Sequence, residues 1–408
     1  MAGAGSFGRN HLRVYRELET AGQGVALVAA IEPNSERAAE TAARYAIPVF
    51  ASAQELLDSG LAVDAATVAV PTVYHHAAAS VLLDGGLDLL VEKPLAATLA
   101  EADELLALAE KKQRILQPGH LERFNPAVLA VEPRLIRPMF FESHRLSIFT
   151  PRALDVDVVL DLMIHDLDIV LTFANSPVRE VRAVGLPILS PKVDIANVRV
   201  EFESGCVANF TASRVSTERV RKLRFFEPRQ YVSIDYARQD LLVIRMDTCD
   251  AADRGTCGAA DGASGAMSTA LAGILAQLPP ELAAKAAAAL SSGKVDPALL
   301  GQLAATGKID PALLAMAGSL MKSKEATPEQ AGPAPGLSFV KPEVTPGEPL
   351  KLELLSFLDA VRTRRAPRVT ARQGRNALAL ALEIQATMAA HAQHAGLGDF
   401  FAPGVLAG

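Results

Sequence analysis

The spacing of apolar and polar residues changes along the chain near residue 136. Before that point, short runs of Val, Ala and Leu alternate with stretches that have helical periodicity. The pattern predicts strands at 25–31, 65–70 and 87–91, and helices at 10–19, 35–45 and 100–112. Strands that alternate with helices favour parallel βαβ units, so we expect an α/β domain with a doubly wound parallel sheet.

The second part of the chain has the pattern of a different sheet. Long segments alternate polar and apolar residues, at 139–149, 178–189, 195–203, 206–213 and 222–236. This period of two predicts a large, mainly antiparallel sheet with one buried face, and Ser204-Gly205 is a predicted hairpin turn. Helices are expected at 158–173, 352–364 and 373–391. The second domain is therefore also predicted to be α/β.

The segment 248–347 differs from both parts, because it is rich in Ala, Gly, Pro and Ser. It contains a repeat in which residues 293–300 (GKVDPALL) recur as 307–314 (GKIDPALL). Asp followed by Pro is a helix start, so each copy should begin a short helix. A lid or a partner-docking hairpin is one interpretation. We favour a tolerated surface insertion, partly helical and partly disordered. The predicted domains are 1–119, 120–247 with 348–408, and the insertion 248–347.

Composition narrows the function classes. The 408 residues are half hydrophobic and carry a formal net charge of −6, with no basic block, which argues against a nucleic-acid-binding protein. Cys206, Cys249 and Cys257 fit neither a disulfide framework nor a zinc pattern, so no metal site is predicted. No apolar run is long enough to cross a bilayer, and no secretory signal is visible. We expect a cytoplasmic globular protein that does not bind membranes.

The first eight residues contain a phosphate-binding pattern. Gly3, Gly5 and Gly8 form a GxGxxG, followed by a helix, a strand and Glu32. In such a loop the first Gly makes a tight turn, the second lets the backbone approach a pyrophosphate, and the third lets the helix pack on the strand. An ordinary tight turn is the alternative interpretation. Ser6 and Phe7 complete the predicted cofactor loop.

One feature conflicts with this motif. The pattern should follow a strand, yet it starts two residues after Met1. That strand is central in a doubly wound sheet, and losing about five buried side chains of the Val class would cost on the order of 8–15 kcal/mol. The expectation is that the native start lies upstream, or that the chain is truncated.

Three clusters carry candidate chemistry. Lys93 follows a predicted parallel strand, at the end where ligands bind. Asp161, His165 and Asp168 share a helix face, and an imidazole beside a carboxylate suits a general base. A third cluster lies directly after the first domain and contains His120, Arg123 and Asn125. The alternatives are a surface Lys at a strand end, a structurally bonded His, and hydrogen bonding within a linker.

Taken together, these motifs resemble one enzyme family. Gly3-x-Gly5-x-x-Gly8, Pro71-x-x-x-His75, Glu92-Lys93-Pro94 and Asp161-x-x-x-His165 are similar, in order and spacing, to the Gfo/Idh/MocA oxidoreductases over roughly 1–245 and 349–390. The resemblance implies a Rossmann domain, a C-terminal domain whose open sheet packs against another subunit, and NAD(P)-dependent hydride transfer at a sugar or polyol carbon. A homo-oligomer, dimeric or tetrameric, is therefore expected.

The resemblance also implies roles for single residues. Lys93 matches the active-site lysine, and Asp161 and His165 match the acid/base pair. His75 matches a residue beside the nicotinamide. Pro71 and Glu92 belong to the predicted cofactor-binding set, together with Lys93 and the glycine loop.

A narrower resemblance concerns the substrate. The segments 119–126, 154–168 and 211–216 resemble the bacterial UDP-N-acetylglucosamine 3-dehydrogenase branch, which prepares 3-amino sugars for lipid A. His120, Arg123, Asn125 and Arg214 are then the predicted substrate-binding residues. Two alternatives stay open: an inositol or free-sugar dehydrogenase, and a non-catalytic NAD-binding regulator. A regulator would be expected to lose Lys93 or His165, and both are present.

The resemblance and the residues together define an expected mechanism. His165 takes the proton of a secondary hydroxyl, Asp161 orients the imidazole and raises its pKa, and Lys93 hydrogen-bonds the developing alkoxide. The rate should then rise with pH at or above neutrality. The cofactor should be NAD rather than NADP, because Glu32 would repel a 2′-phosphate and Arg37 is expected on the outer face of its helix.

Overall fold

The computed structural model describes residues 1–150, 156–246 and 337–400. The chain divides into two units, Met1–Ile244 with Phe339–Gly408, and Arg245–Ser338. The repeat at 293–314 and two of the cysteines, Cys249 and Cys257, lie outside the described residues.

The N-terminal part is the expected arrangement of strands and helices. Its strands run parallel, β1 with β2 and β3 with β4 and β5. The strands are β1 (Ala30–Ile31), β2 (Val49–Phe50), β3 (Ala65–Val68), β4 (Asp88–Glu92) and β5 (Leu116–Gly119). The helices are α1 (Gly8–Thr20), α2 (Ser35–Tyr45), α3 (Ala53–Asp58), α4 (His75–Asp84) and α5 (Leu99–Lys112). The predicted Rossmann-like parallel sheet is confirmed.

The first residues of the chain contribute only isolated bridges to the centre of this sheet. Ala2 forms parallel bridges to both Ile31 and Val68, so the first residues lie between β1 and β3. The strand predicted at 25–31 is wrong over 25–29, which are not strand, because this stretch has no neighbouring strand to complete a ladder. Residues 24–29 and 62–67 instead line a cavity of about 570 Å³ that also contacts Met1. The amino group of Met1 is buried there and donates to the Ala29 carbonyl at 3.0 Å.

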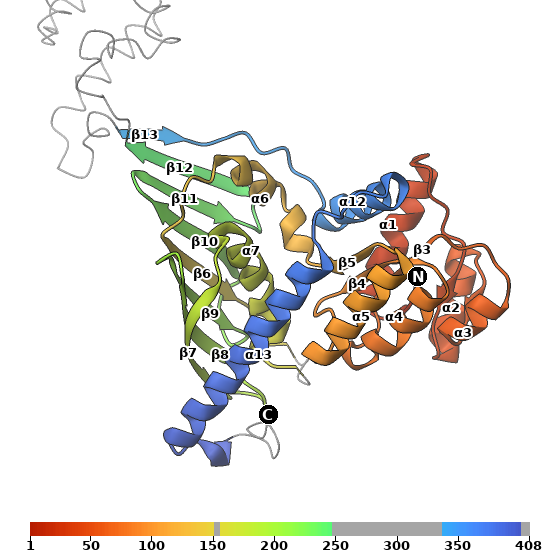
Figure 1. The fold of residues 1–408 in the computed structure, drawn as a ribbon, viewed down its shortest axis with the longest axis horizontal. Helices are drawn as coiled ribbons and strands as arrows, with labels where there is room; N and C mark the ends of the chain where they lie inside the picture. The colour runs from red at the N-terminus through yellow and green to blue at the C-terminus, as the bar shows by residue number, and fades with distance from the viewer. Residues whose placement is uncertain (151–155, 247–336, 401–408) are drawn as a thin grey trace, which may run out of the picture. The chain divides into compact units, whose positions relative to one another are not determined.

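The second sheet has eight strands in the order β13-β12-β11-β10-β6-β9-β8-β7 (Figure 1). β10 pairs antiparallel with β11 and β6, and β8 pairs antiparallel with β7 and β9, whereas β6 and β9 run parallel. The strands are β6 (Phe140–Leu146), β7 (Val178–Leu186), β8 (Ile195–Phe202), β9 (Val207–Ser213), β10 (Val220–Glu227), β11 (Gln230–Asp235), β12 (Asp240–Met246) and β13 (Leu337–Val340). The large, mainly antiparallel sheet is confirmed.

Sequence reasoning missed three details of this sheet. The single segment predicted at 222–236 is a hairpin, β10 and β11, whose turn contains Arg229 with a φ of 65°. β12 was not predicted, since it follows directly on another strand. β13 lies inside the predicted insertion, so the boundary placed at 347 includes a strand of the sheet. The hairpin turn at Ser204-Gly205 is confirmed, with Gly205 at a φ of 82°.

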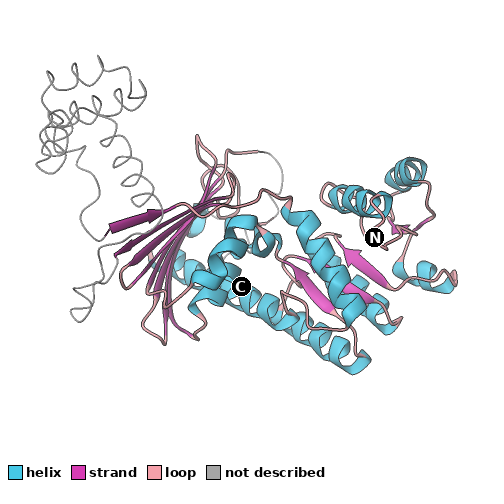
Figure 2. Ribbon diagram, turned by 90° about the horizontal axis from the view of Figure 1, so that it is seen from above, coloured by secondary structure: helices cyan, strands magenta, loops and turns pink. Residues whose placement is uncertain are grey.

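One face of the large sheet is covered by helices (Figures 1 and 2). α7 (Ile164–Ala174) and α13 (Ala371–His394) pack on it, and α6 (Pro126–Val131) lies beside β11. Inward positions such as Phe141, Val198 and Phe225 are buried, as the alternating pattern predicts. α13 also contacts α5 and β5 of the parallel sheet, and α12 (Pro349–Thr363) contacts α1. These two C-terminal helices therefore hold the two sheets together.

The helix predicted at 158–173 begins with an irregular turn. Residues Val159–Met163 form a π-helical turn, η4, and α7 continues from Ile164. The Asp157 carboxylate accepts hydrogen bonds from the N–H groups of Val159 and Leu160, and from the side chain of Gln385 in α13. π turns place a residue out of the α-helical register and are frequent at functional sites. This one contains Asp161.

Candidate active site

The glycine loop has the geometry that a dinucleotide requires. Gly3 has a φ of 90°, and a Cβ there would lie 2.6 Å from the Ala69 carbonyl oxygen. A Cβ on Gly8 would lie 2.0 Å from the Gly3 carbonyl oxygen, whereas a Cβ on Gly5 would meet nothing within 4 Å. Gly5 thus faces open space, and the N-terminus of α1 has no side-chain cap at Phe7. The residues fit a pyrophosphate at this helix end, with Ser6 and Phe7 in the loop.

Glu32 closes the same site from β1. Its carboxylate accepts hydrogen bonds from the N–H groups of Ala4 and Asn34, and from Arg37 at 2.9 Å. Burial acts to raise the pKa of Glu32, but the hydrogen bonds from Arg37 and the two N–H groups outweigh it and lower the pKa. Arg37 therefore faces Glu32, and its expected place on the outer face of α2 is wrong. The attraction between the two charges explains the difference.

The Glu92-Lys93-Pro94 segment begins at the last residue of β4 and is contacted by two histidines. His11 of α1 lies 2.8 Å from the Glu92 carboxylate. His75 is buried, with Nδ1 2.8 Å from the Pro94 carbonyl oxygen and Nε2 2.9 Å from that of Val70. Burial lowers the pKa of His75, and the two carbonyls only partly oppose this. Through these two contacts His75 links the lysine segment to the loop that follows β3. This loop contains Val70 and the exposed Pro71.

Lys93 reaches from the parallel sheet to the π turn. Its ammonium donates to the Asp161 carbonyl oxygen at 2.6 Å and to that of Leu160 at 3.4 Å. The Asp161 carboxylate lies 3.7 Å away. Burial lowers the pKa of Lys93, while Asp161 and Glu92 raise it in part. The structure thus brings together Lys93 and Asp161, which are 68 residues apart in the sequence.

His165 lies one turn further along, and its electrostatic environment differs from the expected one. Its Nδ1 is buried and has no hydrogen-bond partner among the described residues. Burial lowers the pKa of His165 well below its usual value, and the positive charges of Lys93 and Arg145 lower it further. The expected raising of this pKa by Asp161 is wrong. In the described part of the chain, no hydrogen bond joins the Asp161 carboxylate to the imidazole, because the carboxylate faces Lys93 instead.

The residues predicted to hold the substrate are mostly internal. Arg123 is buried, donates to the Thr172 hydroxyl at 2.5 Å and lies 3.5 Å from Asp168. Asn125 caps α6 and donates to the Tyr236 carbonyl. His120 is buried, which lowers its pKa. Arg123 and Asn125 are thus engaged with groups of the protein itself, and their contacts with a diphosphate stay a prediction.

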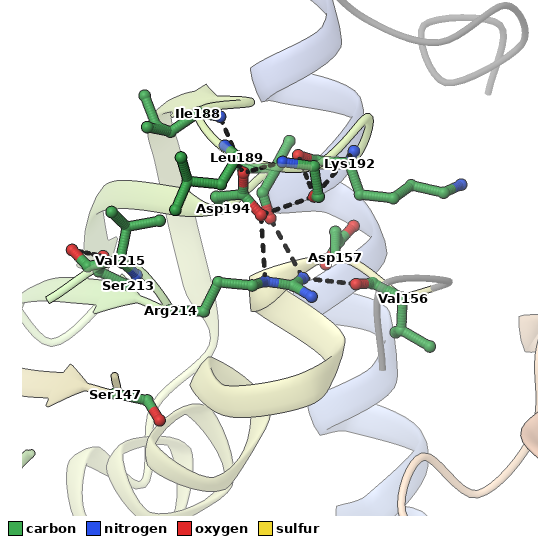
Figure 3. A network of polar contacts seen from close by, with 12 residues as sticks. Ser147, Val156, Asp157, Ile188, Leu189, Lys192, Asp194, Ser213, Arg214 and Val215 are labelled. Atoms are coloured by element: carbon green, nitrogen blue, oxygen red, sulfur yellow. Dashed lines mark hydrogen bonds and ion pairs between the residues drawn. The ribbon is translucent and has the colours of Figure 1, made fainter. Parts of the chain in front are cut away.

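Arg214 is the fourth residue of that set, and it is also internal (Figure 3). Its guanidinium donates to the carbonyls of Val156 and Val193 and lies 3.4 Å from the Asp194 carboxylate. Asp194 in turn accepts hydrogen bonds from three successive N–H groups, those of Ile188, Leu189 and Ser190. Arg214 therefore holds Val156, one residue before the Asp157 that caps the π turn.

Two features of the site were missed from the sequence. Arg145 on β6 forms a bidentate pair with Asp166, at 2.7 and 3.0 Å, and binds Glu122 at 3.0 Å. Its guanidinium also lies 5.1 Å from the centre of the Tyr236 ring. Glu353 of α12 is buried, and burial with the nearby Glu92 raises its pKa well above the usual value. The sequence did contain a signal for Arg145, because a charged residue stands at an inward position of the alternating β6 pattern. No comparable signal marked Glu353.

No helix in the described residues is long and apolar enough to cross a membrane. No group of three or more His, Cys, Asp or Glu side chains in this part of the chain could hold a metal ion. Cys206 is a buried free thiol.

Comparison with known proteins identifies the family. Residues 1–120 match the profile "Oxidoreductase family, NAD-binding Rossmann fold", and residues 130–229 match the "GFO/IDH/MocA C-terminal domain". The UDP-N-acetylglucosamine 3-dehydrogenase of Acidithiobacillus ferrooxidans is 37% identical over 59% of this chain and 74% of its own length. The chain belongs to the Gfo/Idh/MocA family. It is therefore an oxidoreductase with an NAD-binding Rossmann domain.

Other similar proteins have different activities. An inositol 2-dehydrogenase of Leifsonia xyli is 29% identical over 44% of this chain and 54% of its own length. Among solved structures, UDP-N-acetylglucosamine 3-dehydrogenase GnnA from A. ferrooxidans covers 95% of both chains, with a TM-score of 0.69 and 27% identity. Relatives of this family thus act on sugar-like alcohols, including a nucleotide-sugar and inositol.

Proposed function

We propose that this protein oxidises a secondary hydroxyl of a nucleotide-sugar to a ketone, with the 3-hydroxyl of UDP-N-acetylglucosamine as the substrate group. The observation that supports this most is the convergence of Lys93 and Asp161 at the π turn that leads into His165. The proposed catalytic set then consists of a cation, a carboxylate and an imidazole near the carboxyl end of β4. The similarity to the A. ferrooxidans enzyme supports the nucleotide-sugar.

Each of these side chains has a defined chemical task in the proposal. NAD⁺, held by the glycine loop and Glu32, supplies the hydride acceptor. His165 takes the hydroxyl proton on its imidazole, which is neutral because burial and nearby cations lower its pKa. Lys93 donates to the substrate oxygen and stabilises the negative charge that develops on it. Asp161 holds the Lys93 ammonium near that oxygen.

The matched experiment is a substrate panel. Purified protein and NAD⁺ are mixed with UDP-N-acetylglucosamine, its uronate, myo-inositol, scyllo-inositol and free N-acetylglucosamine, and NADH formation is followed by absorbance. UDP-N-acetylglucosamine should give the highest kcat/KM. Faster turnover of an inositol or a free sugar would keep the family and reject the nucleotide-sugar. A protein that binds NAD⁺ and turns over nothing would support the non-catalytic regulator.

We also propose that the uncovered face of the large sheet packs against another copy of the chain. Three aromatic rings gather there on neighbouring strands, with Phe226 at 5.5 Å from Phe140 and 5.2 Å from Tyr231. Light scattering on the wild type and on Phe226→Lys tests this. A dimeric or tetrameric mass that falls in the variant is expected, and a monomeric wild type would reject the proposal.

A further inference from the structure

An arginine that the mechanism does not use stands beside the proposed active site. Arg221 is at the start of β10, opposite Arg145 in the ladder with β6. Position 221 has the same orientation as the buried Leu223 and Phe225, which places it on the helix-covered face. Its side chain nevertheless remains 49% exposed. Arg221 is thus a half-exposed cation on the sheet face that is covered by α7, the helix that contains His165.

The two acidic neighbours of Arg221, Glu122 and Asp166, are shared with Arg145. Arg145 already engages both Asp166 and Glu122 by hydrogen bonds. The ion pair of Arg221 in the described residues is to the same Glu122, at 3.9 Å, beyond hydrogen-bond distance. Arg219, two residues earlier, adds a further positive charge nearby. Among the described residues, no acceptor within hydrogen-bond distance therefore fixes the orientation of the Arg221 guanidinium.

The same cation acts on His165. Arg221 is among the positive groups that lower the pKa of the imidazole, with Lys93, Arg145 and His120. Three permanent or near-permanent cations, Lys93, Arg145 and Arg221, therefore act on His165. A planar, forked donor such as Arg221 favours an anion with several oxygens, and a diphosphate is such a group. Arg123, which was expected to fill this role, is buried against Thr172 and Asp168.

We propose that Arg221 binds the diphosphate of the nucleotide-sugar substrate and sets the preference for a nucleotide-sugar over a free sugar or polyol. This proposal rests on the proposed function, because it concerns the same site. Lys93 and His165 act on the sugar hydroxyl, and Arg221 holds the charged group beyond the sugar. The residue contributes binding rather than chemistry, so its loss should act on KM.

A binding experiment tests the anion contact without turnover. UDP and uridine are titrated by calorimetry into the NAD⁺-loaded wild type, Arg221→Gln, Arg221→Lys and the control Arg224→Gln. Arg224 lies on the same strand, is similarly exposed at 42%, and occupies a position on the opposite face. Loss of a charged hydrogen-bond donor should weaken UDP binding about 10- to 100-fold in Arg221→Gln, with partial recovery in Arg221→Lys. Uridine binding, and all binding by Arg224→Gln, should stay unchanged.

Turnover then separates this inference from the proposed function. Arg221→Gln should raise KM for UDP-N-acetylglucosamine by a similar factor, leave kcat within a few-fold, and leave KM for NAD⁺ unchanged. Equal UDP affinity in wild type and Arg221→Gln, or no UDP binding by the wild type, would overturn the role of Arg221. Tight, Arg221-dependent UDP binding without oxidation of UDP-N-acetylglucosamine would instead reject the substrate and keep the anion site.

Discussion

Lys93 has its hydrogen-bond acceptors on another element, the π turn that leads into α7. Replacing it with Met removes the cation while keeping a side chain of similar length. Because loss of one donor to a developing oxyanion usually costs about 10²–10³ in rate, kcat should fall by at least that factor. The affinity for NAD⁺, measured by fluorescence quenching or calorimetry, should change little, since the glycine loop and Glu32 are intact. A variant with more than about a tenth of wild-type kcat would remove Lys93 from the mechanism.

The pKa of His165 predicts the pH dependence of the reaction. The imidazole acts as a base only when neutral, and its pKa is held well below 6.5 by burial and by Lys93 and Arg145. The ratio kcat/KM for oxidation should therefore rise through a limb below 6.5 and be flat by neutral pH. In His165→Asn the limb and most of the rate should disappear, because Asn cannot accept the proton. A limb that persists in His165→Asn would point to another base.

Glu32 predicts the cofactor preference, with Arg37 as a modifier. The Glu32 carboxylate should accept the ribose hydroxyls of NAD and repel a 2′-phosphate, so kcat/KM should be higher with NAD than with NADP. In Glu32→Ser the repulsion is gone and Arg37 is released from its 2.9 Å contact, so the preference should shift toward NADP. Steady-state kinetics with both cofactors measures this. Equal values for the wild type would reject the role of Glu32.

At the scale of elements, a buried ion pair fixes the backbone just before the π turn η4. Asp194 and Arg214 hold the Val156 carbonyl next to the capped π turn. Asp194→Asn removes the charge that faces Arg214, and breaking a buried pair typically costs about 3–5 kcal/mol. The free energy of unfolding should fall by an amount of that order, and kcat should fall with KM for NAD⁺ unchanged.

Urea denaturation and steady-state kinetics measure the two effects of Asp194→Asn. Glu180→Gln is the matched control. Glu180 pairs with Arg182 on the same strand, β7, and this exposed ion pair should contribute less than about 1 kcal/mol to the free energy of unfolding. Equal losses in the two variants would show that the buried pair has no special role.

The elements also show what sequence patterns can and cannot predict. The helix expected at 35–45 coincides with α2, because its Asn34 cap and its periodicity are local signals. The strand at 25–31 was only partly correct, since a strand also needs neighbours, and these are non-local. The motifs predicted a site of Lys93, Asp161 and His165, and the structure brings Lys93 and Asp161 into contact. The burial of Arg123 and Arg214 could not be predicted, because their partners Asp168 and Asp194 are distant in the sequence.

At the scale of the whole molecule, the polypeptide of 408 residues, when produced with Met1 as its first residue, has a buried amino group that makes its stability depend on pH. Burial lowers its pKa from 8.0 to about 5. Between these values the unfolded chain binds the extra proton, so the free energy of unfolding should fall as the pH decreases from 8 to 5. Three pKa units correspond to about 4 kcal/mol. Chemical denaturation across this range should show a shallower slope for a chain acetylated at Met1, whereas equal slopes would contradict a buried free amine.

The contact between Lys93 and the π turn also indicates which changes of sequence this chain should tolerate. The acceptors at 2.6 and 3.4 Å are backbone carbonyls, which every amino acid supplies. The alignment of the lysine by these two bonds therefore depends on the path of the backbone at the turn. Substitution of Leu160 should leave both hydrogen bonds in place, whereas insertion of one residue into the turn should move the carbonyls away from the lysine.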